Sequence, residues 1–133
     1  MKPKLIAACL VCLLAVLVMA AERTPATKLI GDITYQPYRV ATTAPTKLYA
    51  VTGYNSGSAQ FVLIFTTLNA SGAAPTNTQG ASFCIPVGAT QGFSFDLSYY
   101  GVDVDSVTVA NSTSPTNYIA GSTNCSFQII VAN

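Results

Sequence analysis

The stretch FVLIFTT, residues 61–67, decides the fold class of this chain. Its five apolar residues follow one another without a polar interruption, as in a strand that is buried on both faces. The β-branched pair Thr66 and Thr67 disfavours a helix. We therefore expect a strand over residues 59–68, preceded by the turn-forming run NSGS at residues 55–58.

Residues 91–97 carry a second strand signal of a different kind. Phe93, Phe95 and Leu97 alternate with Ser94 and Asp96. Because successive side chains of a strand point to opposite faces, this alternation predicts a strand with one apolar and one polar face.

The remaining strand-like segments are separated by turn signals, and beyond residue 21 no apolar residues recur at helical spacing over three turns. This pattern predicts an all-β fold, an antiparallel β-sandwich of about seven or eight strands with jelly-roll or Ig-like topology. A small barrel is the alternative. The chain has no tryptophan, so an antibody-like Cys–Trp–Cys core is excluded. The other expected strands are residues 28–35, 38–42, 46–54, 82–87, 104–110 and 125–132.

The N-terminus has the features of a secretory signal. Lys2 and Lys4 precede an apolar run that ends in small residues. We expect a signal peptide over residues 1–21 with cleavage after Ala20 or Ala21, a flexible lead-in over 22–27, and a sandwich domain over 28–133. An uncleaved anchor and a lipoprotein box at residues 6–9 are the alternatives. The predicted location is secreted or cell-surface, either extracellular or periplasmic.

Charge is scarce in the larger part of the chain. From residue 48 to residue 133 there is no Lys, Arg, His or Glu. This region can therefore supply very little for general acid–base catalysis or for a basic nucleic-acid surface, and a Ser–His arrangement cannot form without histidine. We expect no enzyme activity, no catalytic residue, no cofactor and no nucleic-acid partner. Removal of residues 1–21 leaves four cations and five carboxylates, a net charge of −1.

Cys84 and Cys125 are the two cysteines outside the signal segment. An exported domain is in an oxidising environment, so we expect a disulfide between them. Two buried thiols are one alternative. A catalytic thiol is the other, and it would lack a histidine base.

Asp96, Asp103 and Asp105 are the carboxylates of the charge-poor region. They are weak calcium candidates, because carboxylates combined with backbone carbonyls suit that ion. The alternative is that they are solvent-facing charges that oppose edge-to-edge aggregation. We expect no other metal site.

Tyr99 and Tyr100 form a candidate contact surface beside these carboxylates. Tyrosine favours protein interfaces, and its ring can stack on a sugar. Packing at a corner of the sandwich is the alternative use of the two rings. Three glycosylation sequons begin at Asn69, Asn111 and Asn124, and Ser/Thr/Asn-rich loops produce such matches by chance.

Five further segments are KLYAVTGYN (residues 47–55), QFVLIF (60–65), FSFDLSYYG (93–101), NST (111–113) and NCSF (124–127). Together they resemble small β-sandwich proteins of tailed phages and uncharacterised exported bacterial proteins. The resemblance implies a sandwich fold with a structural or adhesive role, and it names no catalytic residue. A cleavable signal favours an exported host protein over a virion component.

These observations predict a non-enzymatic exported protein that assembles or adheres as a filament, surface or virion-like subunit. Its expected partners are copies of itself or a molecule on another surface, such as a protein or a glycan. The membrane is involved only through the signal segment before cleavage. A carbohydrate-binding module is the main alternative, and a cryptic hydrolase is the third.

Overall fold

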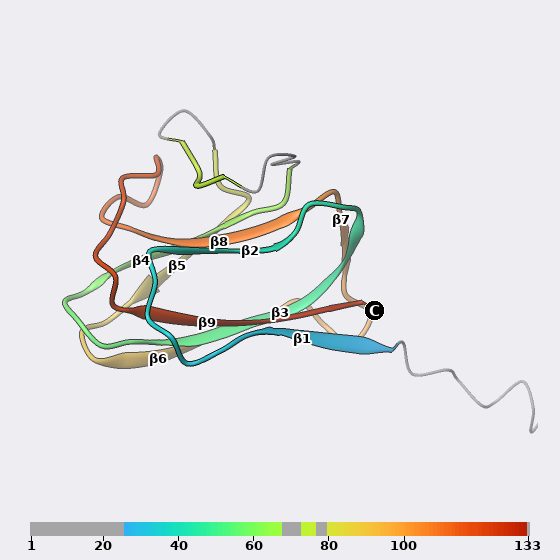
Figure 1. Cartoon of the computed structure of the whole chain (residues 1–133), viewed down its shortest axis with the longest axis horizontal. Helices are drawn as coiled ribbons and strands as arrows, with labels where there is room; N and C mark the ends of the chain where they lie inside the picture. The colour runs from blue at the N-terminus through green and yellow to red at the C-terminus, as the bar shows by residue number, and fades with distance from the viewer. Residues whose placement is uncertain (1–25, 68–72, 77–79, 133) are drawn as a thin grey trace, which may run out of the picture.

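The computed structural model describes residues 26–67, 73–76 and 80–132, and the signal peptide expected over residues 1–21 lies outside these ranges. The described residues form nine strands in two antiparallel sheets that pack face to face (Figure 1). In this part of the chain no helix is long and apolar enough to cross a membrane. The strands are β1 (Thr27–Gly31), β2 (Tyr38–Thr42), β3 (Thr46–Asn55), β4 (Gln60–Phe65), β5 (Phe83–Val87), β6 (Gln91–Asp96), β7 (Val102–Val104), β8 (Val107–Ser112) and β9 (Cys125–Ala132).

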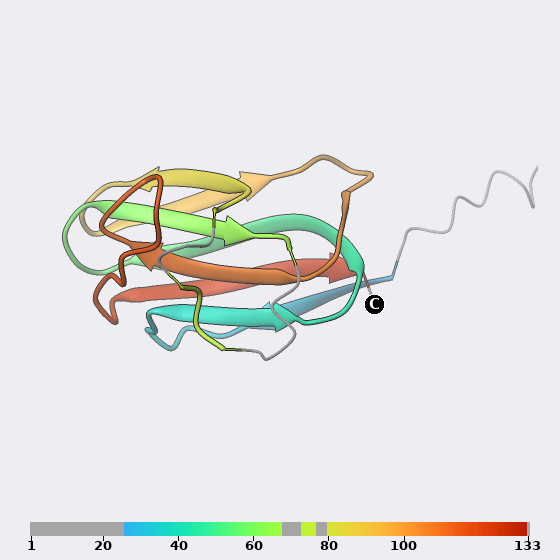
Figure 2. The same ribbon diagram turned by 90° about the horizontal axis from the view of Figure 1, so that it is seen from above.

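The strands pair in a nested order. One sheet, sheet A, runs β1-β9-β3-β6, with β7 also paired to β3, and the other, sheet B, runs β2-β8-β4-β5. Strands near the two ends of the chain are therefore neighbours, and those in the middle pair with each other. Figure 2 shows β5 and β6 along one side of the molecule and β1 and β2 along the opposite side. The predicted all-β, two-sheet antiparallel fold is confirmed.

The core lies between the inner faces of the two sheets. β6 confirms the predicted alternation, because Phe93 and Phe95 pack against the core while Ser94 and Asp96 are exposed. The fully buried apolar side chains of this core include Leu48, Val51, Val62, Ile64, Val107, Val109, Phe127 and Ile129.

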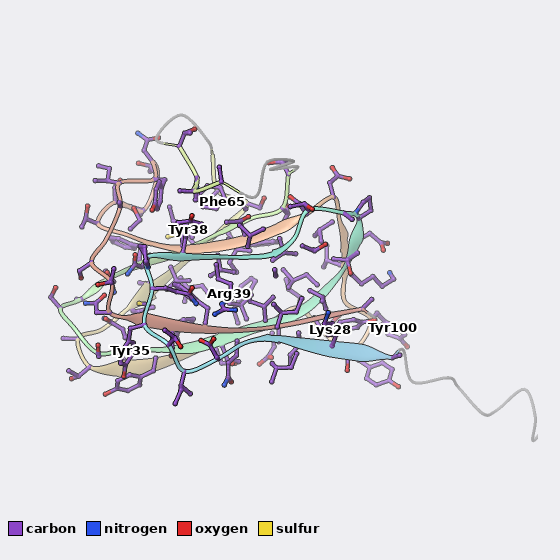
Figure 3. The ribbon with its side chains drawn as sticks, viewed as in Figure 1. Lys28, Tyr35, Tyr38, Arg39, Phe65 and Tyr100 are labelled. Carbon is purple, nitrogen blue, oxygen red and sulfur yellow. The ribbon has the colours of Figure 1, made fainter. Side chains whose placement is uncertain are left out.

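β4 is buried on both faces, as its uninterrupted apolar run predicted. Val62 and Ile64 face the inner core, whereas Leu63 and Phe65 belong to a second cluster on the outer side of sheet B. Tyr118 covers that cluster, with its ring centroid 6.3 Å from that of Phe65. Residues 73–76 and 113–120 lie over the same side of the sheet (Figure 1), and Figure 3 shows Phe65 there.

Three elements differ from the expected ones. The strand expected over residues 104–110 is β8, which begins at Val107 and ends at Ser112. β1 ends at Gly31 and does not continue to residue 35, because Gly31 has a φ of 134° that only glycine adopts readily. β7 was not expected. It is three residues long and pairs with Thr46, Lys47 and Leu48 at the start of β3.

Candidate functional site

Tyr99 and Tyr100 project from the turn that follows β6. The turn is closed by the Gly101 N–H, which donates to the Ser98 carbonyl at 3.2 Å, and both residues have positive φ. Tyr99 is 60% exposed and Tyr100 is 80% exposed, so the rings are available to a partner. They pack edge to face, with their centroids 5.5 Å apart. Figure 3 shows Tyr100 at one end of the molecule.

A groove of about 590 Å³ lies beside Tyr99 on the outer face of sheet A. Four residues that pair across neighbouring strands form one row on this face, which we call the outer row: Leu29, Ile130, Ala50 and Asp96. The groove lies along this row and is lined by Thr27, Tyr49, Ala50, Asp96, Ser98, Tyr99 and Ile130.

The outer row is apolar except at its Asp96 end. Leu29 is 58% exposed although it is a large aliphatic residue. The Ser94 hydroxyl donates to Oδ2 of Asp96 at 3.2 Å. Among the described residues no cation lines the groove, and Asp96 is the one carboxylate in its lining. Such a surface suits a neutral ligand or protein side chains more than an anion.

The three candidate calcium ligands are not brought together. Asp96 lines the groove, whereas Asp103 and Asp105 line a separate hollow beside Pro45. Asp103 forms an ion pair with Lys47, whose Nζ is 2.9 Å from Oδ1. The described residues contain no group of three or more His, Cys, Asp or Glu side chains that could hold a metal ion.

The structure contradicts the predicted disulfide, because Cys84 and Cys125 are both free thiols. Cys84 pairs with Leu63 and therefore faces the outer side of sheet B, where it is exposed. Cys125 belongs to sheet A and is buried in the inner core. The two side chains thus start from different sheets, and the Cys84 side chain points away from the core that holds Cys125.

Cys125 instead adjoins a buried cluster of amide side chains at one end of the sandwich. Asn55 and Cys125 are paired residues on the inner face of sheet A, and Gln60 and Asn111 face them from sheet B. We use the term amide cluster for the side chains of Asn55, Gln60, Asn111 and Asn124 together with the Cys125 thiol.

Hydrogen bonds connect every member of the amide cluster. Gln60 Nε2 faces three acceptors, with Asn55 Oδ1 and Asn124 Oδ1 each at 2.9 Å and Cys125 Sγ at 3.0 Å. Asn111 Nδ2 donates to Asn124 Oδ1 at 3.3 Å and to the Ser122 carbonyl. Asn55 and Asn111 are fully buried, and buried amides are costly unless they are bonded in this way.

The environment of the Cys125 thiol favours its neutral form. Burial raises the pKa of Cys125, although hydrogen bonds from Asn111 and Gln60 act in the opposite direction.

Burial within the amide cluster also decides whether a glycosylation sequon is accessible. Asn111 is enclosed in the folded protein, so its amide is unavailable for glycosylation, and Asn69 lies outside the described residues.

Sequence reasoning missed the amide cluster, although an alternation signal for it was present. Val107 and Val109 face the core from β8, and continuing this alternation by two residues places Asn111 inward. Counting back from Phe127 places Cys125 inward in the same way. Polar residues at the inward positions of a strand end were the available sign.

No family model, no curated protein and no solved structure matches the chain.

Proposed function

We propose that this chain is a non-enzymatic exported protein with a structural or adhesive role, and that it makes its contacts through the outer face of sheet A. The observation that carries the proposal is the difference between the two outer faces. The second apolar cluster of sheet B is covered by Tyr118, whereas Leu29 and Tyr99 of the sheet A face are exposed. Exposed apolar groups gathered on one face are typical of interaction sites.

The pairing order supports one topology over the other. The first strand pairs with the last, the second with the next to last, and the middle strands with each other. This is the arrangement of a jelly roll, a double-sheet fold used by capsid and lectin domains. We therefore favour a jelly roll over an Ig-like sandwich. The charge-poor composition and the signal-like N-terminus support a non-enzymatic exported role.

Self-association through the outer row is the form of this function that we test first. Light scattering after size-exclusion chromatography, over a range of protein concentrations, should show association that Leu29→Glu abolishes. Ile33→Glu is the matched control, because Ile33 is 83% exposed and does not belong to the outer row. A monomer at every concentration, or equal association in both variants, would contradict this form of the proposal.

Binding of a neutral saccharide is the second candidate, and the groove favours it. Tyr99 offers an exposed ring, and Asp96 and Ser98 offer hydroxyl-binding groups next to that ring. A glycan array should detect a neutral oligosaccharide whose binding is lost in Tyr99→Ala. Tyr54→Ala is the control, because Tyr54 is a half-exposed tyrosine whose hydroxyl donates to Thr90 outside the groove. Equal loss in both variants would remove this candidate.

A further inference from the structure

The amide cluster places a thiol against a carboxamide from the opposite sheet. Cys125 begins β9 in sheet A, and Gln60 begins β4 in sheet B. Gln60 Nε2 lies 3.0 Å from Cys125 Sγ, and both residues are buried. A hydrogen bond between two buried groups explains the contact, and the carboxamide carbon is one bond beyond the nitrogen that touches the sulfur.

The carboxamide of Gln60 is held in place by its neighbours. Asn55 Oδ1 and Asn124 Oδ1 accept hydrogen bonds from Nε2, each at 2.9 Å. Rotation of the amide would turn its oxygen towards these two acceptors, so the orientation with Nε2 beside the sulfur is favoured. A thiol and a carboxamide that are held side by side react within one molecule and avoid the entropy cost of an encounter.

We propose that Cys125 and Gln60 form an internal thioester after folding. The sulfur attacks the carboxamide carbon of Gln60, so that the Sγ–Cδ bond forms and the Cδ–Nε2 bond breaks. The thiol proton passes to the leaving nitrogen, which departs as ammonia. The step needs no oxidant, no reductant and no further reactant.

The surroundings of the pair supply what this step requires. Burial keeps water away from the thioester. The Cys125 thiol must lose its proton to attack, and the hydrogen bonds from Asn111 and Gln60 oppose the effect of burial, which raises its pKa. Asn111 Oδ1 is buried and, among the described residues, has no hydrogen-bond partner. It lies in the same cluster as Gln60, where it can accept a hydrogen bond from the departing ammonia. Because each molecule reacts once, a slow reaction suffices.

The product would be a covalent connection between the two sheets. β9 and β4 belong to different sheets, so an Sγ–Cδ bond would close a loop of the chain across the core. The loss of chain entropy in the unfolded state would then stabilise the fold, as a disulfide does. Cys125 would provide a cross-link even though Cys84 faces away from it.

The mass of the unmodified full-chain protein tests the proposal without any variant. The purified protein is kept mildly acidic, and its mass is compared with the value calculated from its determined N-terminus. We expect a deficit of one ammonia molecule. An unchanged mass, the small gain that accompanies deamidation, or the loss of two hydrogens that marks a disulfide would each overturn the proposal.

Thiol counting separates the thioester from loss of ammonia at an asparagine. In the unfolded protein an alkylating reagent should label Cys84 and leave Cys125 unlabelled. Methylamine should then add to Gln60 and release the Cys125 thiol for labelling. If Cys125 is labelled before methylamine is added, the proposal is wrong.

Three variants provide the matched set. Cys84→Ser should retain the mass deficit, because Cys84 is exposed on the other sheet. Cys125→Ser should remove it, as should Gln60→Glu, in which no amide nitrogen remains to leave. Retention of the deficit in Gln60→Glu would assign the loss of ammonia to another residue and overturn the proposal.

Discussion

Asn55 shows how one buried side chain can organise the end of a sheet. Its Nδ2 donates to the Ser58 and Gly88 carbonyls at 2.8 and 2.9 Å. Its Oδ1 accepts from the Gly57 backbone N–H at 3.0 Å and from Gln60 Nε2. A single carboxamide therefore connects the β3–β4 turn, the β5–β6 turn and the start of β4.

Replacing Asn55 with Ala should lower the free energy of unfolding by about 3 kcal/mol, because three part-buried backbone hydrogen bonds and the bond to the buried Gln60 amide are lost together. Urea denaturation measures the change. Asn117→Ala is the control, since Asn117 is an exposed amide and its loss should change stability by no more than about 0.5 kcal/mol. Equal effects of the two substitutions would show that the amide cluster does not stabilise the fold.

Gly121 tests the close packing around the same cluster. A Cβ on Gly121 would lie 2.8 Å from both Asn111 Oδ1 and Gln60 Oε1, so Gly121→Ala should destabilise the protein by about 1–3 kcal/mol. Gly80→Ala is the matched substitution, because no atom of the described residues lies within 4 Å of its Cβ position. Thermal melting of the two variants should rank Gly121→Ala well below Gly80→Ala. The opposite order would contradict the observed packing.

At the residue scale, sequence predicted which side chains alternate but not which groups meet. The two-residue period of a strand predicts that Phe93 and Ser94 point to opposite faces of the sheet, and the structure confirms this. Whether the side chains of Cys84 and Cys125 can meet depends on which sheet each strand joins. The spacing of the two cysteines along the chain does not contain that information. The exposure of Tyr99 depends in the same way on the turn beside it.

At the scale of elements, the connection between β1 and β2 is fixed by one carboxylate. The Thr34 backbone N–H donates to Asp32 Oδ1 at 2.8 Å, and Arg39 Nη2 lies 3.1 Å from Oδ2. The Thr34 bond is the main cause that lowers the pKa of Asp32, with Arg39 adding to it. Figure 3 shows Arg39 pointing from β2 towards the sheet that contains β1.

Asp32→Asn should therefore reduce stability only where Asp32 is charged. A lowered folded-state pKa means that the contribution is present above the unfolded pKa of about 3.9 and is lost as pH falls through the folded pKa. Urea melts from pH 7 to pH 2 should show the variant less stable at neutral pH and equal to the wild type at the acidic end. Asp105→Asn, at an exposed carboxylate outside both ion pairs of the described residues, is the control. A constant difference across the range would contradict the assignment.

The strands themselves were predictable because their signals are local. β4 and β6 follow from apolar runs and alternation, and β9 follows from Phe127, Ile129 and Val131 on one face. β7 was missed because it is three residues long and forms only through pairing with β3. The early end of β1 was missed because the conformation of Gly31 depends on its neighbour β9.

At the scale of the whole molecule, one core joins the two sheets, and Phe127 is its largest fully buried side chain. The predicted fold class rests on many weak strand signals that agree, whereas the nested order depends on contacts between strands far apart in the chain. Those contacts are made by side chains of similar size and chemistry, so composition cannot distinguish one pairing order from another.

Phe127→Ala should cost about 3–5 kcal/mol, a large share of the stability of a domain of this size. Urea denaturation followed by circular dichroism measures the loss. Ile33→Ala removes a large aliphatic side chain that is almost fully exposed, and should change stability by less than about 0.5 kcal/mol. If both variants behave alike, the inner cluster is not the main core.

The pairing of β1 with β9 also determines how this body responds to mechanical load. Thr27 at the start of β1 is paired with Ala132 at the end of β9, and Figure 1 shows both ends on the same side of the molecule. A force that separates these ends would break the hydrogen bonds between β1 and β9 one after another. It would not load all of them at once in shear. The sandwich would therefore open at low force when it is pulled by these two strand ends.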